Sequence, residues 1–202
     1  DLFELPDDYR ARYNIAPTQD VLAVIRADDG LRAGWLRWGL IPFWARDPSI
    51  GNRMINARAD SIASKPAFRD AFRRRRCLIV ADGFYEWQEV GSARVPMWIH
   101  RASHRPFTFA GIWERWQPPE GEPIFSCAII TTEANDALRP IHERMPVILP
   151  PEDRAKWLDP DADPETLLGL LRPYPGDDLR AHTVSTLVNS PRNDLPECIE
   201  PV

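Results

Sequence analysis

The stretch Met54–Trp87, MINARADSIASKPAFRDAFRRRRCLIVADGFYEW, holds the features that decide the fold. It opens with Asn56 and Arg58, whose side chains share one face if this piece of chain is extended. It closes with a buried-looking strand, a turn, and an aromatic segment that carries Glu86. A carboxylate flanked by aromatic residues just after such a strand is placed where desolvation raises a pKa. We therefore interpret this stretch as the half of the protein that carries the active site.

Length and composition favour one globular domain over residues 1–202, 44% of which are apolar. No apolar run approaches the ~20 residues of a membrane span, and no signal-peptide pattern is present. The three cysteines, Cys77, Cys127 and Cys198, are odd in number, widely spaced and form no CxxC pair. This pattern argues against a disulfide framework or a zinc site and favours a reducing, cytoplasmic setting. We expect no metal and no cofactor.

Charge is unevenly distributed along the chain, although the net charge is only −5. The segment 53–105 carries +6, whereas 1–52 carries −2 and 106–202 carries −9. Arginine supplies 23 of the 25 basic residues, and its guanidinium binds phosphate with two hydrogen bonds and stacks on bases. A local basic face on an acidic protein indicates a binding groove and argues against a basic coat over the whole surface.

Hydrophobic patterning predicts many short strands and few helices. The predicted strands are Val21–Arg26, Leu31–Trp38, Cys77–Ala81, Phe84–Gln88, Val95–Arg101, Phe107–Trp113, Phe125–Thr131 and Val147–Leu149. The predicted helices are Ile62–Arg75, Glu133–Leu138 with Thr132 as its cap, Pro151–Leu158 and Pro164–Leu171, with the end of another in residues 1–18. Val184–Val202 is predicted to be an irregular tail with one or two strand pieces. Without a βαβ rhythm, this order predicts an α+β fold with a curved or barrel-like sheet core and short flanking helices.

Two residues have the chemistry of proton transfer, and each has a simpler alternative. Glu86 is either a desolvated acid or an edge carboxylate that points to water. His142, between two prolines, is either catalytic or a structural hydrogen-bonding residue. His100 and His104 have the i, i+4 spacing of a metal pair, but they fall in a predicted strand and its turn, so we discount that pairing.

The loop Gly39–Asn52 and the strand before it carry aromatic residues that a core normally buries: Trp38, Phe43 and Trp44. They are either core residues or a platform for stacking the bases of a single strand. The run Arg73–Arg76 is either a basic contact surface or a solvated helix end.

Five sequence blocks together resemble the SOS-response-associated peptidase (SRAP) family, in the family's order and over nearly the whole chain. The blocks are Arg12-Tyr13-Asn14-Ile15-Ala16-Pro17, Trp38-Gly39-Leu40-Ile41-Pro42, Ile55-Asn56-Ala57-Arg58, Ala81-Asp82-Gly83-Phe84-Tyr85-Glu86-Trp87 and Ile141-His142-Glu143-Arg144-Met145-Pro146. The resemblance implies a DNA-repair protein that attaches covalently to abasic sites in single-stranded DNA. It also implies a β-rich core with a basic cleft.

The resemblance assigns roles by position. Asn56 would orient a reactive N-terminus, Glu86 would be the general acid/base, and His142 would assist proton transfer during ring opening and imine formation. Residues implied to contact DNA are Arg58, Trp38, Phe43, Trp44, Asn14, Pro17, Thr131 and Arg144. The expected partner is single-stranded DNA with abasic sites, bound by a cytoplasmic monomer that joins the nucleoid when DNA is damaged.

The family's Met-Cys-Gly-Arg start, whose cysteine closes on the imine to a thiazolidine, is not found in these 202 residues. None of the three cysteines occupies its position. The resemblance therefore implies a nucleophile outside this sequence, exposed when the initiator methionine is removed. Two alternatives remain open: a non-covalent module that binds single-stranded or junction DNA, and a cysteine peptidase that acts on other proteins.

Overall fold

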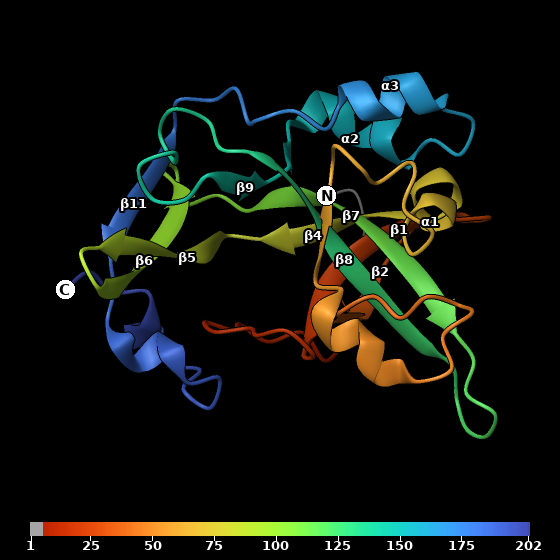
Figure 1. Ribbon diagram of the computed structural model, residues 1–202, viewed down its shortest axis with the longest axis horizontal. Helices are drawn as coiled ribbons and strands as arrows, with labels where there is room; N and C mark the ends of the chain where they lie inside the picture. The colour runs from red at the N-terminus through yellow and green to blue at the C-terminus, as the bar shows by residue number, and fades with distance from the viewer. Residues whose placement is uncertain (1–5) are drawn as a thin grey trace.

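The computed structural model describes residues 6–202 and contains a curved main sheet and a small second sheet (Figure 1). The main sheet runs in the order β10-β7-β4-β1-β2-β8-β3, with β9 beside β8. Its strands are β1 (Asp20–Ala27), β2 (Gly30–Trp38), β3 (Asn56–Arg58), β4 (Arg76–Ala81), β7 (Phe107–Trp116), β8 (Ile124–Glu133), β9 (Arg144–Pro146) and β10 (Ile148–Leu149).

Pairing between β7 and β8 closes part of this sheet into a ring. β1 pairs with β2 and β4, β4 with β7, β7 with β8, and β8 returns in parallel to β2. The predicted α+β fold with a barrel-like core is therefore confirmed. A closed ring leaves few unpaired strand edges, which is how β-rich domains avoid edge-to-edge association.

The small sheet contains β5 (Gly83–Val90), β6 (Ala93–Arg101) and β11 (Leu179–Thr183), in the order β11-β6-β5. In Figure 1 it lies to one side of the barrel, with the C-terminal segment beneath it. The β5–β6 hairpin turns at Gly91, which has a φ of 62°, in the left-handed region that glycine adopts without strain. Apart from the short strands β3, β9 and β11, which are not among the predicted strands, the strand positions agree closely with those predicted from the sequence.

Two hydrophobic cores lie on the two faces of the barrel strands. The helix-side core is buried under α1 (Arg69–Arg74), α2 (Pro151–Leu158) and α3 (Pro164–Gly169), whose Phe72, Trp157 and Leu167 pack into it. The small-sheet-side core includes Ile99 of β6 and Leu179 of β11. Alternation along each strand sends neighbouring side chains to opposite cores, so the residues facing the small sheet can be read from the register.

The prediction of one helix over Ile62–Arg75 is wrong in its first half. Residues 61–68 form successive turns, and the α-helix begins only at Arg69. Pro66 explains the difference, because it lacks a backbone N–H and its ring clashes with the carbonyl four residues earlier, so a regular helix cannot run through it. Phe68 and Phe72 still reach the helix-side core together, as their spacing indicated.

The predicted helix Glu133–Leu138 is also wrong. Thr132 and Glu133 extend β8 and pair with Met145 and Arg144 of β9, so Thr132 does not act as a helix cap. The Asn135 side chain then accepts a hydrogen bond from the Leu138 amide at 3.1 Å, which stabilises a turn in place of a helix.

The two ends of the chain are less regular than the middle. Of the helix end predicted in residues 1–18, positions 1–5 lie outside the described residues, and 6–18 contain turns and no helix. The tail contains the 3₁₀ helices η2 (Thr186–Asn189) and η3 (Pro196–Cys198) and one bridge between Val184 and Pro201. The loop after β2 includes the 3₁₀ helix η1 (Pro48–Arg53). No helix in the described part of the chain has the length and apolar character needed to cross a membrane.

Candidate active site

The short strand β3 presents Asn56 and Arg58 on the face of the main sheet that holds the small-sheet-side core. β3 runs parallel to β8, with Asn56 opposite Ile129 and Arg58 opposite Thr131. Ile129 belongs to the small-sheet-side core, so both polar side chains share its face. This piece is extended, which is the condition under which the two side chains share a face, and both residues are exposed at the edge of the core.

Arg144 of β9 joins this group from the other side of β8. Its guanidinium donates to the Thr131 carbonyl at 2.7 Å and approaches the Thr131 hydroxyl at 3.3 Å. Asp60 holds Arg58 at 2.7 Å and lies 3.9 Å from Arg144. The hydrogen bond from Arg58, with help from Ser61 and Arg144, lowers the pKa of Asp60. Thr131, Arg58 and Arg144, separated in sequence, thus meet as one basic and polar cluster.

A shallow pocket of about 320 Å³ opens at this cluster. Three guanidinium groups line it, and two carboxylates balance part of their charge. The lining residues are Arg58, Arg139, Arg144, Glu133, Glu143 and Ala134. Arginines with exposed donor groups at a pocket rim can bind an anion such as a phosphate.

Glu86 faces the main sheet from β5. Phe84, two residues earlier on the same face, packs in the small-sheet-side core and meets Phe109 of β7 edge-on at 5.7 Å. Tyr85 and Trp87 point the other way, into a third, smaller apolar cluster. Burial raises the pKa of Glu86, and His142, a backbone hydrogen bond at Trp87 and Arg94 offset only part of that rise.

His142 lies close enough to Glu86 for its charge to act on that carboxyl. Its Nδ1 is 3.1 Å from the Arg144 backbone nitrogen and 3.0 Å from the Arg144 carbonyl oxygen. The backbone therefore orients the ring through Nδ1, while the exposed side chain keeps its Nε2 available for proton exchange. Gln88 of β5 donates to the Pro140 carbonyl at 3.0 Å and ties this loop to the strand that carries Glu86.

The three aromatic residues at the end of β2 and in the loop after it differ in their surroundings. Trp38 is half-buried against the small-sheet-side core, and its indole donates to the Ile55 carbonyl, next to Asn56, at 2.9 Å. Phe43 and Trp44 are 56% and 49% exposed on the following loop. The structure thus gives Trp38 a supporting position under β3 and leaves two aromatic rings in solvent.

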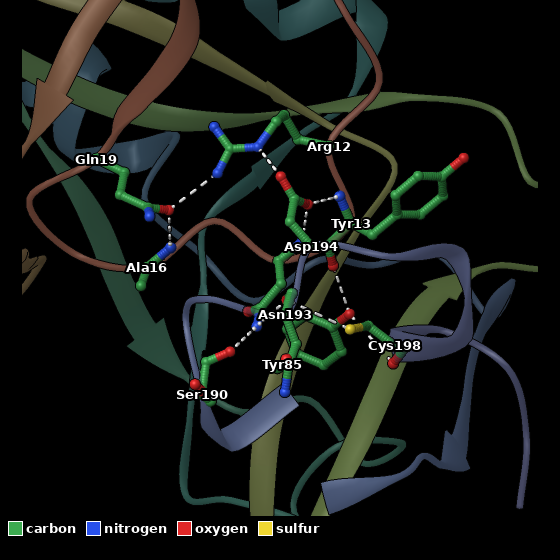
Figure 2. Close-up of polar contacts among 10 residues, drawn as sticks. Arg12, Tyr13, Ala16, Gln19, Tyr85, Ser190, Asn193, Asp194 and Cys198 are labelled. Carbon is green, nitrogen blue, oxygen red and sulfur yellow. Dashed lines mark hydrogen bonds and ion pairs between the residues drawn. The ribbon is translucent and has the colours of Figure 1, made fainter. Parts of the chain in front are cut away.

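The N-terminal segment Arg12–Gln19 lies beside the site and is held by the C-terminal segment (Figure 2). Asn14 is only 5% exposed, and its side-chain amide donates to the carbonyls of Val188, Ser190 and Asn193 at 2.9–3.1 Å. These bonds satisfy the amide within the protein. Pro17 is half-buried, ahead of the turn that begins β1.

The sequence reasoning missed three residues around the site: Asp60, which pairs with both arginines, and Tyr85 and Asp194, which fasten the N-terminal segment. Asp60 could have been found, because it lies two residues after Arg58 on the same short segment. Tyr85 and Asp194 could not, since their partners are 72 and about 180 residues away in the chain.

The cysteines do not form part of this site. All three are buried, and burial raises the pKa of both Cys77 and Cys127 above the ordinary thiol value. Among residues 6–202, no group of three or more His, Cys, Asp or Glu side chains gathers as metal ligands would. Of the run Arg73–Arg76, Arg76 is buried and donates to four backbone carbonyls, whereas Arg73 and Arg74 are exposed.

Comparison with proteins of known sequence finds similarity over almost the whole chain. The chain is 49% identical to the abasic site processing protein YoqW of Bacillus subtilis, over 97% of this chain and 89% of that protein. It is 38% identical to the abasic site processing protein HMCES of Gallus gallus, over 83% of this chain and 56% of that longer protein.

Solved structures give the same result. A protein from Bacteroides thetaiotaomicron superposes with a TM-score of 0.83 at 30% identity, over 92% of this chain and 82% of that one. One from Bordetella bronchiseptica superposes with a TM-score of 0.79 at 29% identity, over 91% and 92%. The family model for the SOS response associated peptidase (SRAP) matches residues 3–191. The chain therefore belongs to the SRAP family.

Proposed function

We propose that this protein senses abasic sites in single-stranded DNA and shields them as a covalent thiazolidine, formed through an N-terminal cysteine. The observation that supports the proposal most directly is the placement of Glu86. A carboxyl group with a raised pKa lies on β5 within electrostatic reach of His142, and the chain after His142 leads into Arg144, which holds Thr131 opposite Arg58. The names of the related proteins point to the same lesion.

The chemistry needs a proton donor and acceptor at one carbon atom. The abasic sugar opens to an aldehyde, the α-amine adds to its carbon, and loss of water gives an imine. The cysteine sulfur then bonds to the imine carbon, and its proton passes to the nitrogen. Each step moves a proton on or off oxygen or nitrogen, which a positioned acid/base accelerates about 100- to 10,000-fold. Glu86 takes this role, and His142 assists it.

The remaining site residues bind the strand and orient the reacting groups. Arg58 and Arg144 hold phosphate beside the lesion, and Thr131 fixes Arg144. Asn56 orients the amine, and Trp38 supports β3 beneath it. The aromatic rings of Phe43 and Trp44 stack on neighbouring bases. Asn14 and Pro17 contribute through the position of the N-terminal segment.

Removal of the initiator methionine by the protein itself, a peptide-bond hydrolysis, exposes the cysteine and accounts for the peptidase activity in the family's name. The imine stage gives the protein lyase-like chemistry. We propose that it acts as a monomer in the cytoplasm and associates with the nucleoid where DNA is damaged.

The test uses protein with its native N-terminus and a single-stranded oligonucleotide that carries one abasic site. A band that survives a denaturing gel is expected with this protein and not with the chain that begins at Asp1. Glu86→Gln should slow the appearance of the band while the affinity for the oligonucleotide stays within about twofold. The matched control is Glu89→Gln, an exposed carboxylate on the same strand, which should react at the unsubstituted rate. Equal rates for Glu86→Gln and the unsubstituted protein would remove Glu86 from the mechanism.

The exposure of Phe43 and Trp44 favours a second function, non-covalent binding of single-stranded or junction DNA. Binding that weakens steeply with salt, without any denaturant-stable product from the native protein, would select this function over the first.

A further inference from the structure

The segment Arg12–Gln19 connects the two sheets that form the site. At one end, the Tyr13 carbonyl accepts a hydrogen bond from the Tyr85 hydroxyl of β5 at 2.6 Å. At the other end, the Thr18 amide donates to the Trp38 carbonyl at 2.7 Å, and the Trp38 amide donates to Gln19. Between them, Ile15 packs against the small-sheet-side core. We call this segment the brace, because it fastens β5 to β2.

Asp194 of the C-terminal segment fixes the brace near its β5 end (Figure 2). One carboxylate oxygen accepts the amides of Tyr13 at 2.6 Å and Asn14 at 3.0 Å, and the other pairs with the Arg12 guanidinium. Burial alone would raise the pKa of Asp194, but these three donors outweigh it and lower the pKa below its ordinary value. The carboxylate is therefore ionised at neutral pH and serves as a charged anchor for two backbone amides.

The rest of the C-terminal segment supports the same anchor. The Asn14 side chain donates to the backbone carbonyls of Val188, Ser190 and Asn193. The Tyr85 hydroxyl contacts the Cys198 carbonyl at 3.2 Å as well as that of Tyr13. Figure 2 shows Tyr85, Ser190, Asn193 and Cys198 of this group on one side of Asp194.

The brace matters because the small sheet has no strand pairing with the main sheet within residues 6–202. The position of Glu86 on β5 relative to the main sheet therefore depends on side-chain packing and on contacts such as the brace. Tyr85, which holds the brace, is the immediate neighbour of Glu86. A displacement at Tyr85 thus reaches the acid/base residue directly.

We propose that Asp194 is a positioning residue: by holding the brace against β5, it keeps Glu86 in place relative to the main sheet, whose strand β3 carries Asn56 and Arg58. The proposal rests on the proposed function for its reaction, but not for its geometry. Asp194 does not touch the DNA or the reacting atoms. It acts through Tyr13 and Tyr85.

The first test substitutes Asp194 with alanine in the protein with its native N-terminus. Because a displacement of about 1 Å can cost about 100-fold in rate, we expect crosslinking to slow by about tenfold to 100-fold, with affinity for the abasic oligonucleotide within about twofold. Asp194→Asn keeps an oxygen that can accept both amides, so it should recover most of the lost rate. Failure of Asp194→Asn to recover any rate, in a folded protein, would overturn the role of the amide anchor.

A pH profile separates positioning from general destabilisation. A loosened β5 admits water to Glu86, which reduces the desolvation that raises its pKa. The inflection that Glu86 contributes to the crosslinking rate should therefore move to lower pH in Asp194→Ala, although His142 and Arg94 still face the carboxyl. An unchanged inflection together with an unchanged rate contradicts the proposal.

Two further variants keep the test sound. Tyr85→Phe removes one hydroxyl and should reproduce the direction of both changes even if Asp194→Ala folds poorly. Glu197→Ala is the matched control, because it removes an exposed carboxylate of the same C-terminal segment, three residues from Asp194. Its rate and inflection should equal those of the unsubstituted protein, and equal losses in all three variants would overturn the specific role of Asp194.

NMR titration of the Glu86 carboxyl in free protein distinguishes failure of this proposal from failure of the proposed function. A lower pKa in Asp194→Ala than in the unsubstituted protein supports the brace even if no covalent product forms. An identical pKa with normal crosslinking in the unsubstituted protein refutes the brace alone.

Discussion

Glu86 illustrates how the surroundings of one residue determine its chemistry. The same glutamate at the edge of a solvated sheet would be ionised and of little use as an acid near neutral pH. On β5 it shares a face with Phe84 and has its pKa raised by burial. The charge of His142 offsets part of that rise.

The raised pKa predicts a pH-dependent cost to stability. The unfolded carboxyl loses its proton near the ordinary value of 4.5, whereas the folded carboxyl keeps it to higher pH. In that window the folded state binds more protons, so the stability contributed by the protonated group is lost as pH rises through the folded pKa. Glu86→Gln, which cannot ionise, should therefore unfold at a higher temperature than the unsubstituted protein at pH 7, with the difference disappearing below pH about 4.

Thermal unfolding of both proteins across this pH range checks the prediction, with Glu89→Gln as the exposed control. A stability difference that stays constant with pH would mean that Glu86 ionises freely in the folded protein.

The sequence revealed the site residues that lie within short motifs and missed those that act across long separations. Asn56 and Arg58 were placed on one face by their spacing alone, and β3 is extended as that requires. Asp194 gave no such signal, because its carboxylate acquires a role only when residues about 180 positions apart meet. The four consecutive arginines also look alike in sequence, yet only Arg76 is buried, and its guanidinium donates hydrogen bonds to backbone carbonyls.

At the scale of elements, strands were predicted more reliably than helices. Strands have their own alternation, and each predicted one lies within or beside an observed strand. The two wrong helices failed where a local feature overrode propensity: Pro66 interrupts one, and pairing of Thr132 and Glu133 with β9 replaces the other. The parallel pairing of β8 with β2 and β3 was not foreseen, because a strand's sequence does not identify its neighbours.

The loop after β2 has an anchored backbone but exposes two aromatic side chains, Phe43 and Trp44. Its backbone is anchored, since the Trp116 indole donates to the Ala45 carbonyl at 2.7 Å and Asp47 caps η1. Its two aromatic rings are nevertheless exposed. Such an arrangement holds Phe43 and Trp44 ready to stack on bases without a cost in ordering the loop.

Trp44→Ala should therefore weaken binding to single-stranded DNA by about 1–3 kcal/mol, the range for one stacked base. The melting temperature should not fall, because the ring is 49% exposed. Fluorescence anisotropy with a labelled oligonucleotide measures the affinity. Leu187→Ala, a similarly exposed apolar residue on η2, is the control and should bind normally. An unchanged affinity for Trp44→Ala would exclude this loop from the DNA interface.

For the whole molecule, the main consequence of the fold is that the site lies between two unequally supported sheets. The barrel strands are paired on both sides and covered by the helix-side core. The small sheet has three strands, and Phe84, Ile99, Leu179 and the brace secure it. In such a site, a small movement of the small sheet is enough to admit a DNA strand. The geometry of the site then depends on the contacts that return the small sheet to its position.

This asymmetry predicts unequal protection of backbone amides from hydrogen exchange. Local opening of a three-stranded sheet exposes less surface than opening of the ring, so it should need less free energy. Amides of β5 and β11 should exchange faster than those of β4 and β7, which lie within the ring. In Asp194→Ala, exchange should accelerate further in β5 and leave β4 and β7 unchanged, because the brace contacts Tyr85. Mass-spectrometric exchange on the free protein measures both effects. Uniform acceleration across all four strands would mean that the two sheets unfold as one unit. Asp194 would then stabilise the whole fold and would have no specific effect on β5, the strand that carries Glu86.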